Sequence, residues 1–350
     1  MVFKTKVMTD LFIPILTIGT AAWGLTGVMV RYAQQLGFVD VPNERSSHSR
    51  IVPRSGGLSV VLTFIGALIF YYFTGRLNAS WAAALIPGAL AVALVGLIDD
   101  HRDVASRTRF LIHLSSAGAA MYFIEGFPAL NLGVMKLDIG ALGYLIGVLF
   151  IAWILNLYNF MDGIDGIAGV ETLTVCWGAA LIGFTHAKGT PFLSEILLLL
   201  GMSSLGFLMW NWPPAKIFMG DVASGFLGYV LAVLVLVCAH VQHVTLWAWL
   251  ILLGCFVVDS TFTLFRRMSR GEKWYNAHRS HTYQRAARKF KSHGKVTFVV
   301  GAVNVFWLLP LAYFANLHTS WGGLFLVIAW LPLLCGAIYF KAGVPDAYSS

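Results

Sequence analysis

Paired acidic and amide side chains interrupt a long apolar stretch near the middle of the chain. Asn156 and Asn159 precede Asp162 and Asp165, and apolar runs lie on both sides of this group. Because the two aspartates are three residues apart, one helical turn would bring both carboxylates to the same face. Oxygen ligands of this kind suit a hard cation such as Mg²⁺, which proteins usually share with phosphate groups. A polar helix cap followed by a turn is the simpler interpretation, but two Asp-Gly pairs after two asparagines favour a functional site.

A second group of carboxylates follows another apolar run. Asp99 and Asp100 are adjacent, and Asp103 comes three residues later. Crowded carboxylates repel one another unless a cation neutralises them, and Mg²⁺ is the simplest such cation. Adjacent residues cannot share one helix face, so one of the pair would bind or orient a ligand while the other acts as a base. A solvated helix end beside Arg102 is the alternative interpretation.

Asp221 opens a further apolar run and directly follows Gly220. Backbone N–H groups at a helix start would favour a phosphate or a metal-bound phosphate at this point. Asn211 lies at the end of the preceding apolar run, and Phe218 lies in the loop between the two runs. Phe218 could stack on a base or anchor the loop at a membrane interface. A Gly-Asp pair alone is equally typical of an ordinary turn.

Histidine and arginine supply the remaining polar candidates. His278 and His281, with Arg279 between them, lie in the most basic loop of the chain, and neutral histidines among arginines suit the binding of a diphosphate. Zinc is not expected there, because no cysteine or third histidine has ligand spacing. Attraction of the loop to anionic lipid is the alternative. Nearer the N-terminus, three further side chains could contact anions: Arg45, His48 and Arg54.

The composition indicates which elements must position these groups. Of the 350 residues, 58% are hydrophobic and 11% are charged, whereas a soluble domain has about 25% charged residues. The chain is therefore expected to be a single all-α polytopic membrane domain over residues 1–350, since apolar runs of this length cross a bilayer as helices. We expect eleven spans, near residues 11–31, 56–73, 81–98, 110–124, 140–158, 169–186, 194–210, 223–240, 246–265, 297–315 and 321–340.

Basic residues set the predicted orientation. Nineteen of the 24 lysines and arginines follow odd-numbered spans, and ten of them lie in the loop 266–296. The positive-inside rule then places the N-terminus in the periplasm and the C-terminus in the cytosol. All four polar clusters follow odd-numbered spans, so we expect one active site on the cytosolic face. The loop 266–296 has room for a short amphipathic helix on the membrane surface, and residues 125–139 are expected to form a small external hairpin or an irregular cap.

Two acids, Glu171 and Asp259, fall inside predicted spans, where a charge is costly and therefore a functional candidate. Asp259 could instead only pair with Arg266 and Arg267, about two turns further along. The four cysteines lie singly in apolar runs, with no spacing that suggests zinc or a disulfide framework. The net charge of +8 does not indicate nucleic-acid binding, because the basic residues are distributed as membrane topology requires.

Together these segments resemble the polyprenyl-phosphate N-acetylhexosamine-1-phosphate transferases, glycosyltransferase family 4. That family includes the bacterial initiators of O-antigen and teichoic-acid synthesis and the phospho-MurNAc-pentapeptide translocase. The resemblance covers about residues 40–288 and rests on five motifs: Asp40-Val41-Pro42 with Arg45, His48, Pro53-Arg54 and Gly56-Gly57; Asp99-Asp100; Asn156 to Gly166; Phe218-Met219-Gly220-Asp221; and His278-Arg279-Ser280-His281. The last motif departs from the translocase's consecutive histidines and is more similar to the O-antigen initiators.

The resemblance implies transfer of an N-acetylhexosamine 1-phosphate from a UDP-sugar to undecaprenyl phosphate. The products would be undecaprenyl diphosphate-sugar and UMP, formed at the cytosolic face of a bacterial inner membrane. This would be the first membrane step of O-antigen or related cell-surface polysaccharide synthesis, within lipopolysaccharide or cell-wall biogenesis. The implied cofactor is Mg²⁺, with Mn²⁺ as an alternative. The implied partners are the two substrates and membrane lipid, with a homodimer left open and no nucleic acid.

The resemblance also implies roles for individual residues. The metal would be held by Asp221 together with Asp99. The lipid phosphate would be deprotonated or oriented by Asp99 and Asp100. The uridine would be held by Asp165, Asn211 and Phe218, with Asn159 and Asp162 nearby and Asn156 as a further substrate-binding candidate. Asp162 and Asp165 are also catalytic candidates, together with Asp99 and Asp100. The diphosphate or sugar phosphate would be bound by His278 and His281, with Arg279 and the anion contacts Arg45, His48 and Arg54.

Three other functions compete with this interpretation. A secondary transporter would carry ionisable residues near the bilayer midplane and a repeat between its halves, whereas most acids here lie at predicted helix ends and no repeat is found. A structural or assembly protein would not need clustered carboxylates. A metal-dependent lipid phosphatase or CDP-alcohol transferase would share Mg²⁺ and a lipid, but the acidic signature of the latter differs. The sugar stays open, because UDP-GlcNAc, UDP-FucNAc and UDP-QuiNAc differ only by a hydroxyl or a stereocentre.

Overall fold

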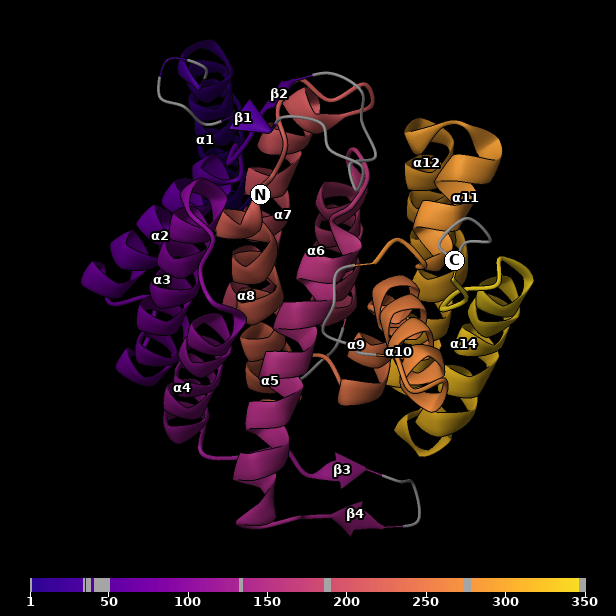
Figure 1. Cartoon of the computed structure of the whole chain (residues 1–350). Helices are drawn as coiled ribbons and strands as arrows, with labels where there is room; N and C mark the ends of the chain where they lie inside the picture. Colours follow the sequence, from indigo (N-terminus) through magenta and orange to yellow (C-terminus); the bar gives the residue numbers. More distant parts are fainter. Residues whose placement is uncertain are drawn as a thin grey trace.

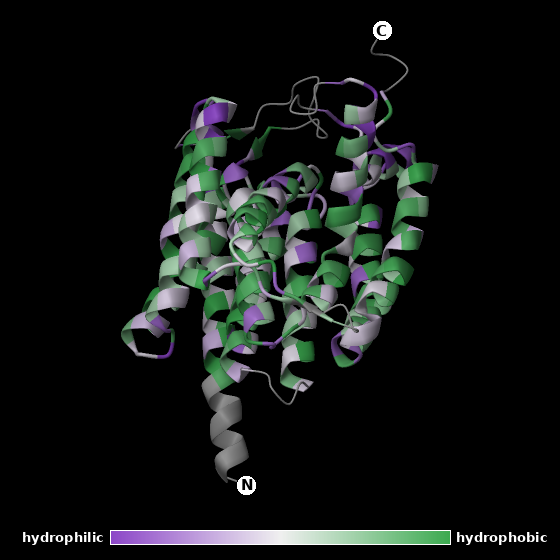
Figure 2. Cartoon of the chain, turned by 90° about the horizontal axis from the view of Figure 1, so that it is seen from below, coloured by the Kyte–Doolittle hydropathy of each residue, from purple (hydrophilic) through white to green (hydrophobic). Residues whose placement is uncertain are grey.

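The computed structural model of the chain describes residues 2–33, 35, 39–40, 51–131, 135–185, 190–272 and 278–345. Long helices dominate this part of the chain, and most of them run side by side as a bundle (Figure 1). Hydrophobic residues cover most of the helices, while hydrophilic residues gather at helix ends and in loops (Figure 2). These features confirm the expected all-α membrane architecture.

The first two thirds of the chain form the larger group of helices. They are α1 (Val2–Tyr32), α2 (Leu58–Phe73), α3 (Ala79–His101), α4 (Ser106–Ile124), α5 (Leu142–Met161), α6 (Ile167–Thr185), α7 (Pro191–Asn211) and α8 (Asp221–His240). Helix α8 lies at the centre, packed between α3 and α5, and every residue from 222 to 238 is buried. A helix that is apolar on all sides is suited to such an enclosed position.

The last third forms a smaller group of helices beside α5 and α6. They are α9 (Leu246–Leu252), α10 (Gly254–Ser269), α11 (Thr282–Phe290), α12 (His293–Val303), the π-helix η1 (Asn304–Leu308), α13 (Leu309–Leu317), the short 3₁₀ helix η2 (Thr319–Trp321) and α14 (Gly322–Tyr339). Helices α9 and α10 meet at a bend of 75°. Helix α11 confirms the amphipathic helix expected in the loop 266–296, since its buried side is Tyr283, Ala286 and Ala287 and its last turn is basic. Its contact with a membrane surface stays a prediction.

Each of the eleven apolar segments expected from the sequence is helical over most of its described length. Among the described residues, eight helices are long and apolar enough to cross a membrane, and the bent pair α9–α10 makes nine. Helix α2 has only 16 residues, and α4 does not meet the same criterion of length and hydropathy. The total of eleven spans and the orientation of the chain therefore stay predictions.

Two short antiparallel strand pairs lie at opposite ends of the bundle (Figure 1). Strand β3 (Leu130–Asn131) pairs with β4 (Lys136–Leu137), which confirms the hairpin expected at residues 125–139. Strand β1 (Val39–Asp40) pairs with β2 (Val52–Pro53) at the end of the bundle where the loop before α8 also lies.

A charged clamp ties α2 to α7 at the end of the bundle away from the loop before α8. Glu195, near the start of α7, accepts hydrogen bonds from the Tyr71 hydroxyl and, at 3.0 Å, from Arg76 Nη1. The Arg76 guanidinium also lies 4.6 Å from the centre of the Tyr71 ring. Because the Glu195 side chain is only 7% exposed, its charge needs these partners. The clamp therefore fixes the α2–α7 packing.

We predict that Glu195→Ala destabilises the protein, because it leaves the Tyr71 hydroxyl without its acceptor and the Arg76 guanidinium without its counterion. Arg76 is partly exposed, so the expected loss is about 2 kcal/mol rather than the larger cost of a fully buried pair. The thermal unfolding midpoint in detergent should fall by roughly 5 °C. The midpoint of Glu195→Gln should fall less, because glutamine keeps an acceptor oxygen. Equal midpoints for wild type and Glu195→Ala would show that the clamp does not contribute to stability.

Candidate active site

The end of α3 and the start of α8 bring three of the expected acids together. The Asp221 backbone N–H donates to Asp100 Oδ1 at 2.8 Å. Arg54 Nη2 lies 2.9 Å from Asp100 Oδ1 and 3.7 Å from Asp221 Oδ1. Arg109 Nη1 contacts Asp99 Oδ2 and lies 3.2 Å from Asp221 Oδ2. Two arginines thus face three carboxylates in a single cluster and neutralise part of their charge.

Asp100 is the innermost member of this cluster, with a side chain that is 0% exposed. Its oxygens accept the backbone N–H groups of Asp221 and Val222 and, at 2.8 Å, the Ser55 hydroxyl. Those N–H groups open α8, whose own N-cap residue, Gly220, has no side chain to satisfy them. Asp100 therefore caps α8 from a neighbouring helix, as the positive end of the helix favours. Its expected role as a base stays a prediction.

The segment after β2 lies along the loop before α8. The Phe218 N–H donates to Pro53 O at 2.8 Å, and the Gly56 N–H donates to Phe218 O at 2.9 Å. This backbone pairing holds Arg54 against the acids. The ring of Phe218 is half-buried, and its expected stacking on a base stays a prediction.

Two glycines allow the close approach of these segments. A Cβ on Gly57 would lie 2.2 Å from Ala223 Cβ, at the start of α8. Gly220 has φ +80°, and a Cβ there would lie 2.3 Å from Asp100 Oδ2. Both positions therefore exclude any side chain, which explains the glycines of the two motifs in physical terms.

Asp162 extends the cluster from the end of α5. Burial raises the pKa of its carboxyl well above the usual range, and the nearby carboxylates of Asp221 and Asp100 raise it further, against a lowering effect of Arg54. Asp162 therefore lies close enough to Asp221 and Asp100 for their charges to interact. A carboxyl of raised pKa is suited to holding a proton taken from a substrate.

The two asparagines of α5 have different surroundings. Asn159 Nδ2 donates to Ser224 Oγ at 3.0 Å and so joins α5 to the first turn of α8. Asn156 Nδ2 donates to Ala152 O of its own helix at 2.7 Å. Asn159 therefore borders the carboxylate cluster directly, whereas the hydrogen bond of Asn156 lies within α5.

Asp165 connects the turn after α5 to other loops. Its Oδ1 lies 3.2 Å from His293 Nδ1, and its Oδ2 accepts the Ala215 N–H at 3.1 Å. Its carbonyl accepts the Thr297 hydroxyl at 2.7 Å. Asp165 therefore joins the turn to the loop before α8 and to the start of α12, and its expected contact with uridine stays a prediction.

Asn211 has a bracing role in the structure. Its side chain is nearly buried, and its Oδ1 accepts the Gly166 N–H at 2.9 Å. Its Nδ2 donates to Ile217 O at 2.8 Å. Both ends of the amide thus hold backbone, which fixes the turn at Gly166 against the loop before α8. Its expected contact with the uridine stays a prediction.

His281 and Asp259 form the junction between α10 and α11. His281 is 2% exposed, and its Nδ1 lies 3.3 Å from Asp259 Oδ1. Asp259 also accepts the backbone N–H groups of Thr282 at 2.9 Å and Tyr283 at 3.0 Å. The buried carboxylate of Asp259 is therefore held by a histidine and by the start of a helix. The sequence did not indicate this partner, having suggested Arg266 and Arg267.

His278 stacks on His281, with 4.8 Å between the ring centres. Its Nδ1 lies 3.0 Å from Ser280 Oγ and also faces the Ser280 N–H. Burial, followed by the proximity of His281 and Arg267, lowers the pKa of His278 to about 3. The ring is therefore neutral near pH 7, as the sequence predicts. The neighbouring Arg279 is half-buried, and its carbonyl accepts a hydrogen bond from another arginine of the loop.

Helix α11 covers the turn that follows α5. The Tyr283 hydroxyl donates to Phe160 O at 2.8 Å, and a Cβ on Gly163 would lie 2.2 Å from Tyr283 Oη. The histidine loop therefore adjoins the Asp162–Gly166 turn. The structure thus brings all four expected polar clusters to one end of the bundle. Arg45 and His48 lie outside the described residues.

Sequence reasoning missed the residue that bridges two of the acids. Arg109 is on α4, ten residues beyond Asp99, and belongs to none of the motifs that the sequence shows. No spacing in the sequence predicts the contact of Arg109 with Asp221, because this contact depends on the turn between α3 and α4. The available signal was a pair of arginines, Arg107 and Arg109, in the first turn of an otherwise apolar helix.

The residues of the cluster fit a Mg²⁺ ion. Asp99 Oδ2 and Asp221 Oδ2 converge on the same cationic atom, Arg109 Nη1, so the two carboxylates can face one cation. The Asp221 side chain is 25% exposed. Within the described residues no group of three His, Cys, Asp or Glu side chains forms a metal cage. Mg²⁺ commonly uses one or two carboxylates and completes its coordination with substrate phosphates and water.

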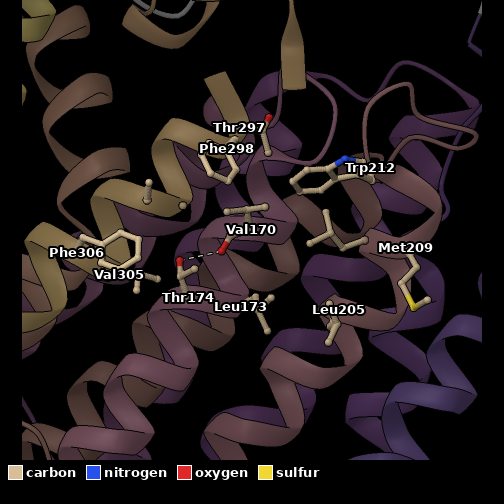
Figure 3. Close-up of a pocket in the computed structure, with 13 residues that line it drawn as sticks. Val170, Leu173, Thr174, Leu205, Met209, Trp212, Thr297, Phe298, Val305 and Phe306 are labelled. Atoms are coloured by element: carbon tan, nitrogen blue, oxygen red, sulfur yellow. Dashed lines mark hydrogen bonds between the residues drawn. The ribbon is translucent and has the colours of Figure 1, made fainter. Parts of the chain in front are cut away.

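An apolar groove opens on the flank of α6, α7 and α12, with a volume of about 690 Å³. Figure 3 shows Trp212 and Thr297 at one end of the groove and Phe306 toward the other. Hydrocarbon dominates its lining, and Thr297 at its end donates to the carbonyl of Asp165. The groove therefore joins a hydrocarbon surface to the polar turn.

Comparison with known proteins agrees with this architecture. Residues 81–239 match the family model of glycosyl transferase family 4. A probable undecaprenyl-phosphate N-acetylglucosaminyl 1-phosphate transferase of Bacillus subtilis (strain 168) is 31% identical over 87% of this chain and 84% of its own length. An undecaprenyl-phosphate alpha-N-acetylglucosaminyl 1-phosphate transferase of Thermotoga maritima is 27% identical over 84% of this chain and 89% of its own. A phospho-N-acetylmuramoyl-pentapeptide-transferase of Thermotoga neapolitana is 31% identical, but over only 52% of this chain.

An acidic cluster at the end of an apolar helical bundle, together with these relatives, defines a membrane-embedded transferase. The chain belongs to glycosyl transferase family 4, the polyprenyl-phosphate hexosamine-1-phosphate transferases.

We predict that His278 makes the folded state sensitive to acid. The folded protein holds the pKa of His278 at about 3, whereas the unfolded value is about 6.5. Between these values the unfolded chain binds more protons, so stability falls as the pH falls from the upper value. His278→Asn keeps an acceptor near Ser280 but does not titrate. The difference between its unfolding midpoints at about pH 7 and about pH 5 should be smaller than in wild type, and an equal difference would contradict the neutral histidine.

Proposed function

We propose that the protein transfers an N-acetylhexosamine 1-phosphate, with N-acetylglucosamine as the first candidate, from a UDP-sugar to undecaprenyl phosphate. One observation carries the proposal, namely the meeting of Asp99, Asp100 and Asp221 with Arg54 and Arg109 where apolar helices end. The names of the relatives from Bacillus subtilis and Thermotoga maritima support both the sugar and the lipid acceptor.

The reaction joins two anions, so charge neutralisation and positioning are its main requirements. An oxygen of the lipid phosphate attacks the phosphorus that carries the sugar. A new P–O bond forms to the lipid phosphate, the P–O bond to UMP breaks, and UMP leaves with the bridging oxygen. Any proton on the attacking oxygen passes to a carboxylate, for which Asp162 is the candidate at the edge of the cluster, because Asp99 would hold the metal.

The residues of the cluster have separable roles in this proposal. Asp100 positions Asp221 by capping α8, and Arg54 and Arg109 supply fixed positive charge beside the phosphates. Asp99 and Asp221 would hold Mg²⁺, which would neutralise phosphate charge when bound. Neutral His278 donates a hydrogen bond to a phosphate oxygen through its second ring nitrogen.

The location of the cluster suits a lipid acceptor. The apolar helices provide a hydrocarbon environment for a polyprenyl chain, and the acids lie where those helices end. The groove on the flank of α6 and α7 ends beside the turn of Asp165 and can take a stretch of lipid chain. The proposed product would begin a cell-surface polysaccharide of the O-antigen or cell-wall type on the cytosolic side of the inner membrane.

Release of UMP tests the proposed function. Purified protein would be incubated with undecaprenyl phosphate, Mg²⁺ and a panel of UDP-N-acetylhexosamines. We expect UMP and a lipid-linked sugar phosphate to appear together, and both to require the lipid and the divalent ion. Failure of every donor in the panel to yield UMP would contradict the proposal.

We predict that Asp221→Asn lowers kcat by at least about 100-fold, because the substitution removes a charge needed to neutralise the transition state. Asp138→Asn, the same change in the hairpin at the other end of the bundle, is the matched control and should leave kcat unaffected. Both variants should insert and unfold like wild type. Normal turnover by Asp221→Asn would remove this carboxylate from the catalytic machinery.

A further inference from the structure

His293 is a histidine that the proposed reaction does not use, although it lies against a residue of the candidate site. It is the first residue of α12, and its side chain is 22% exposed. Its Nδ1 lies 3.2 Å from Asp165 Oδ1, and the Asp165 backbone N–H faces the same nitrogen at 3.4 Å. One ring atom of His293 therefore contacts both the carboxylate and the backbone of Asp165.

The next turn of α12 holds the same residue. Thr297 follows His293 by four residues, so the two side chains lie on one face of the helix. Thr297 is buried, and its hydroxyl donates to Asp165 O at 2.7 Å. A Cβ on Gly166 would lie only 3.3 Å from Thr297 Cγ2, which shows how closely α12 packs on the turn. One face of α12 thus fixes both the side chain and the carbonyl of Asp165.

The loop before α8 holds the turn from another direction. The Ala215 N–H donates to Asp165 Oδ2 at 3.1 Å, and the Gly166 N–H donates to Asn211 Oδ1 at 2.9 Å. The two carboxylate oxygens of Asp165 are therefore contacted from different elements, Oδ1 from α12 and Oδ2 from the loop. Because only 14% of the Asp165 side chain is exposed, these contacts set the direction of its carboxylate.

The two contacts of His293 Nδ1 use different forms of the imidazole. A ring with a proton on Nδ1 donates it to the Asp165 carboxylate, whereas a neutral ring with its proton on Nε2 accepts the Asp165 N–H. Both forms hold Asp165 through the same nitrogen. The contact therefore requires a polar atom bonded to Cγ of residue 293, and it does not require a ring that titrates.

We infer that His293 is a positioning residue, which acts through Asp165 and fixes the direction in which this carboxylate meets the nucleotide. The effect on the nucleotide rests on the proposed function, in which Asp165 holds the uridine, whereas the effect on the turn does not. Uridine lies away from the phosphorus that reacts, so His293 acts on binding of the donor and not on the chemical step.

Hydrogen–deuterium exchange of purified full-length protein tests the contact itself. In His293→Phe, the amides of residues 164–170 should exchange about 2- to 12-fold faster than in wild type, the range expected for one lost hydrogen bond. His293→Asn should exchange nearly as wild type, because the asparagine amide atoms are also bonded to Cγ. His240→Phe is the matched control, since His240 lies at the other end of α8 and its Nε2 contacts Gly126 O at 2.8 Å. It should leave residues 164–170 unchanged.

Steady-state kinetics test the effect on the nucleotide. We expect His293→Phe to raise KM for the UDP-sugar by about 3- to 10-fold while kcat stays within about twofold, as for a loss of binding that is equal in the ground state and the transition state. His293→Asn should recover most of the KM. His293→Gln should not, because its amide group is one bond further from the backbone and takes the place of Nε2. His240→Phe should keep both constants.

A double-mutant cycle with Asp165→Ala separates positioning from direct binding. Affinity for UDP would be measured by calorimetry in wild type, in His293→Phe, in Asp165→Ala and in the double variant, and exchange of residues 166–170 would be read in the same four proteins without nucleotide. If His293 acts through Asp165, its replacement has little further effect once the carboxylate is gone. Additive effects would show that His293 acts on the nucleotide by itself, and would overturn the inference.

Two other results would also overturn it. One is wild-type exchange of residues 164–170 in His293→Phe, and the other is a KM in His293→Gln as low as that in His293→Asn. If His293→Phe does not fold, His293→Gln takes its place in every experiment. If wild type neither binds UDP nor turns over a UDP-sugar, the proposed function fails, and the exchange rates still decide whether His293 positions Asp165.

Discussion

Neutralisation of crowded carboxylates is the constraint on which the rest of the structure depends. Asp99, Asp100 and Asp221 meet at the ends of apolar helices, where the low dielectric strengthens their repulsion. Arg54 and Arg109 approach from two different segments and balance part of this charge. The close backbone pairing after β2 and the glycines that permit it follow from that requirement. A site whose own residues are in deficit of positive charge is suited to a divalent ion.

The polar contacts around the cluster form two layers with different tasks. Groups close to Asp221 carry exposed charge and can reach a substrate. Groups further out, including Asn211, Asp165 and Asp259, have their hydrogen-bonding atoms occupied by backbone or histidine and hold loops in place. Each of these three side chains accepts a backbone hydrogen bond and so helps to rigidify the loop that it contacts. Phosphoryl transfer depends mainly on the positioning of its substrates and on charges that are already in place, and the loops held in this way provide both.

Much of the fold could be read from the sequence because long apolar runs have one structural solution in a bilayer. The sequence also predicted that the four polar clusters lie together, because the number of spans and the positions of the basic residues place all four on one side of the membrane. Residue pairs that depend on helix crossing could not be predicted, such as Arg109 with Asp221 or Glu171 with Asn304. The bend before α10 was missed for a related reason, since residues 246–265 form one continuous apolar run in sequence. Asn211 and Asp100 were recognised as important, but only their contacts reveal that they hold backbone.

The central claim is that Asp99 and Asp221 face one divalent ion at the substrate-binding end of the bundle. Electron paramagnetic resonance titration of purified protein with Mn²⁺ tests this claim most directly. The account predicts stoichiometric, saturable binding that tightens when UDP is added and is lost when both aspartates are replaced by asparagine. Mn²⁺ binding that survives the double replacement, or the absence of any saturable site with UDP present, would contradict it.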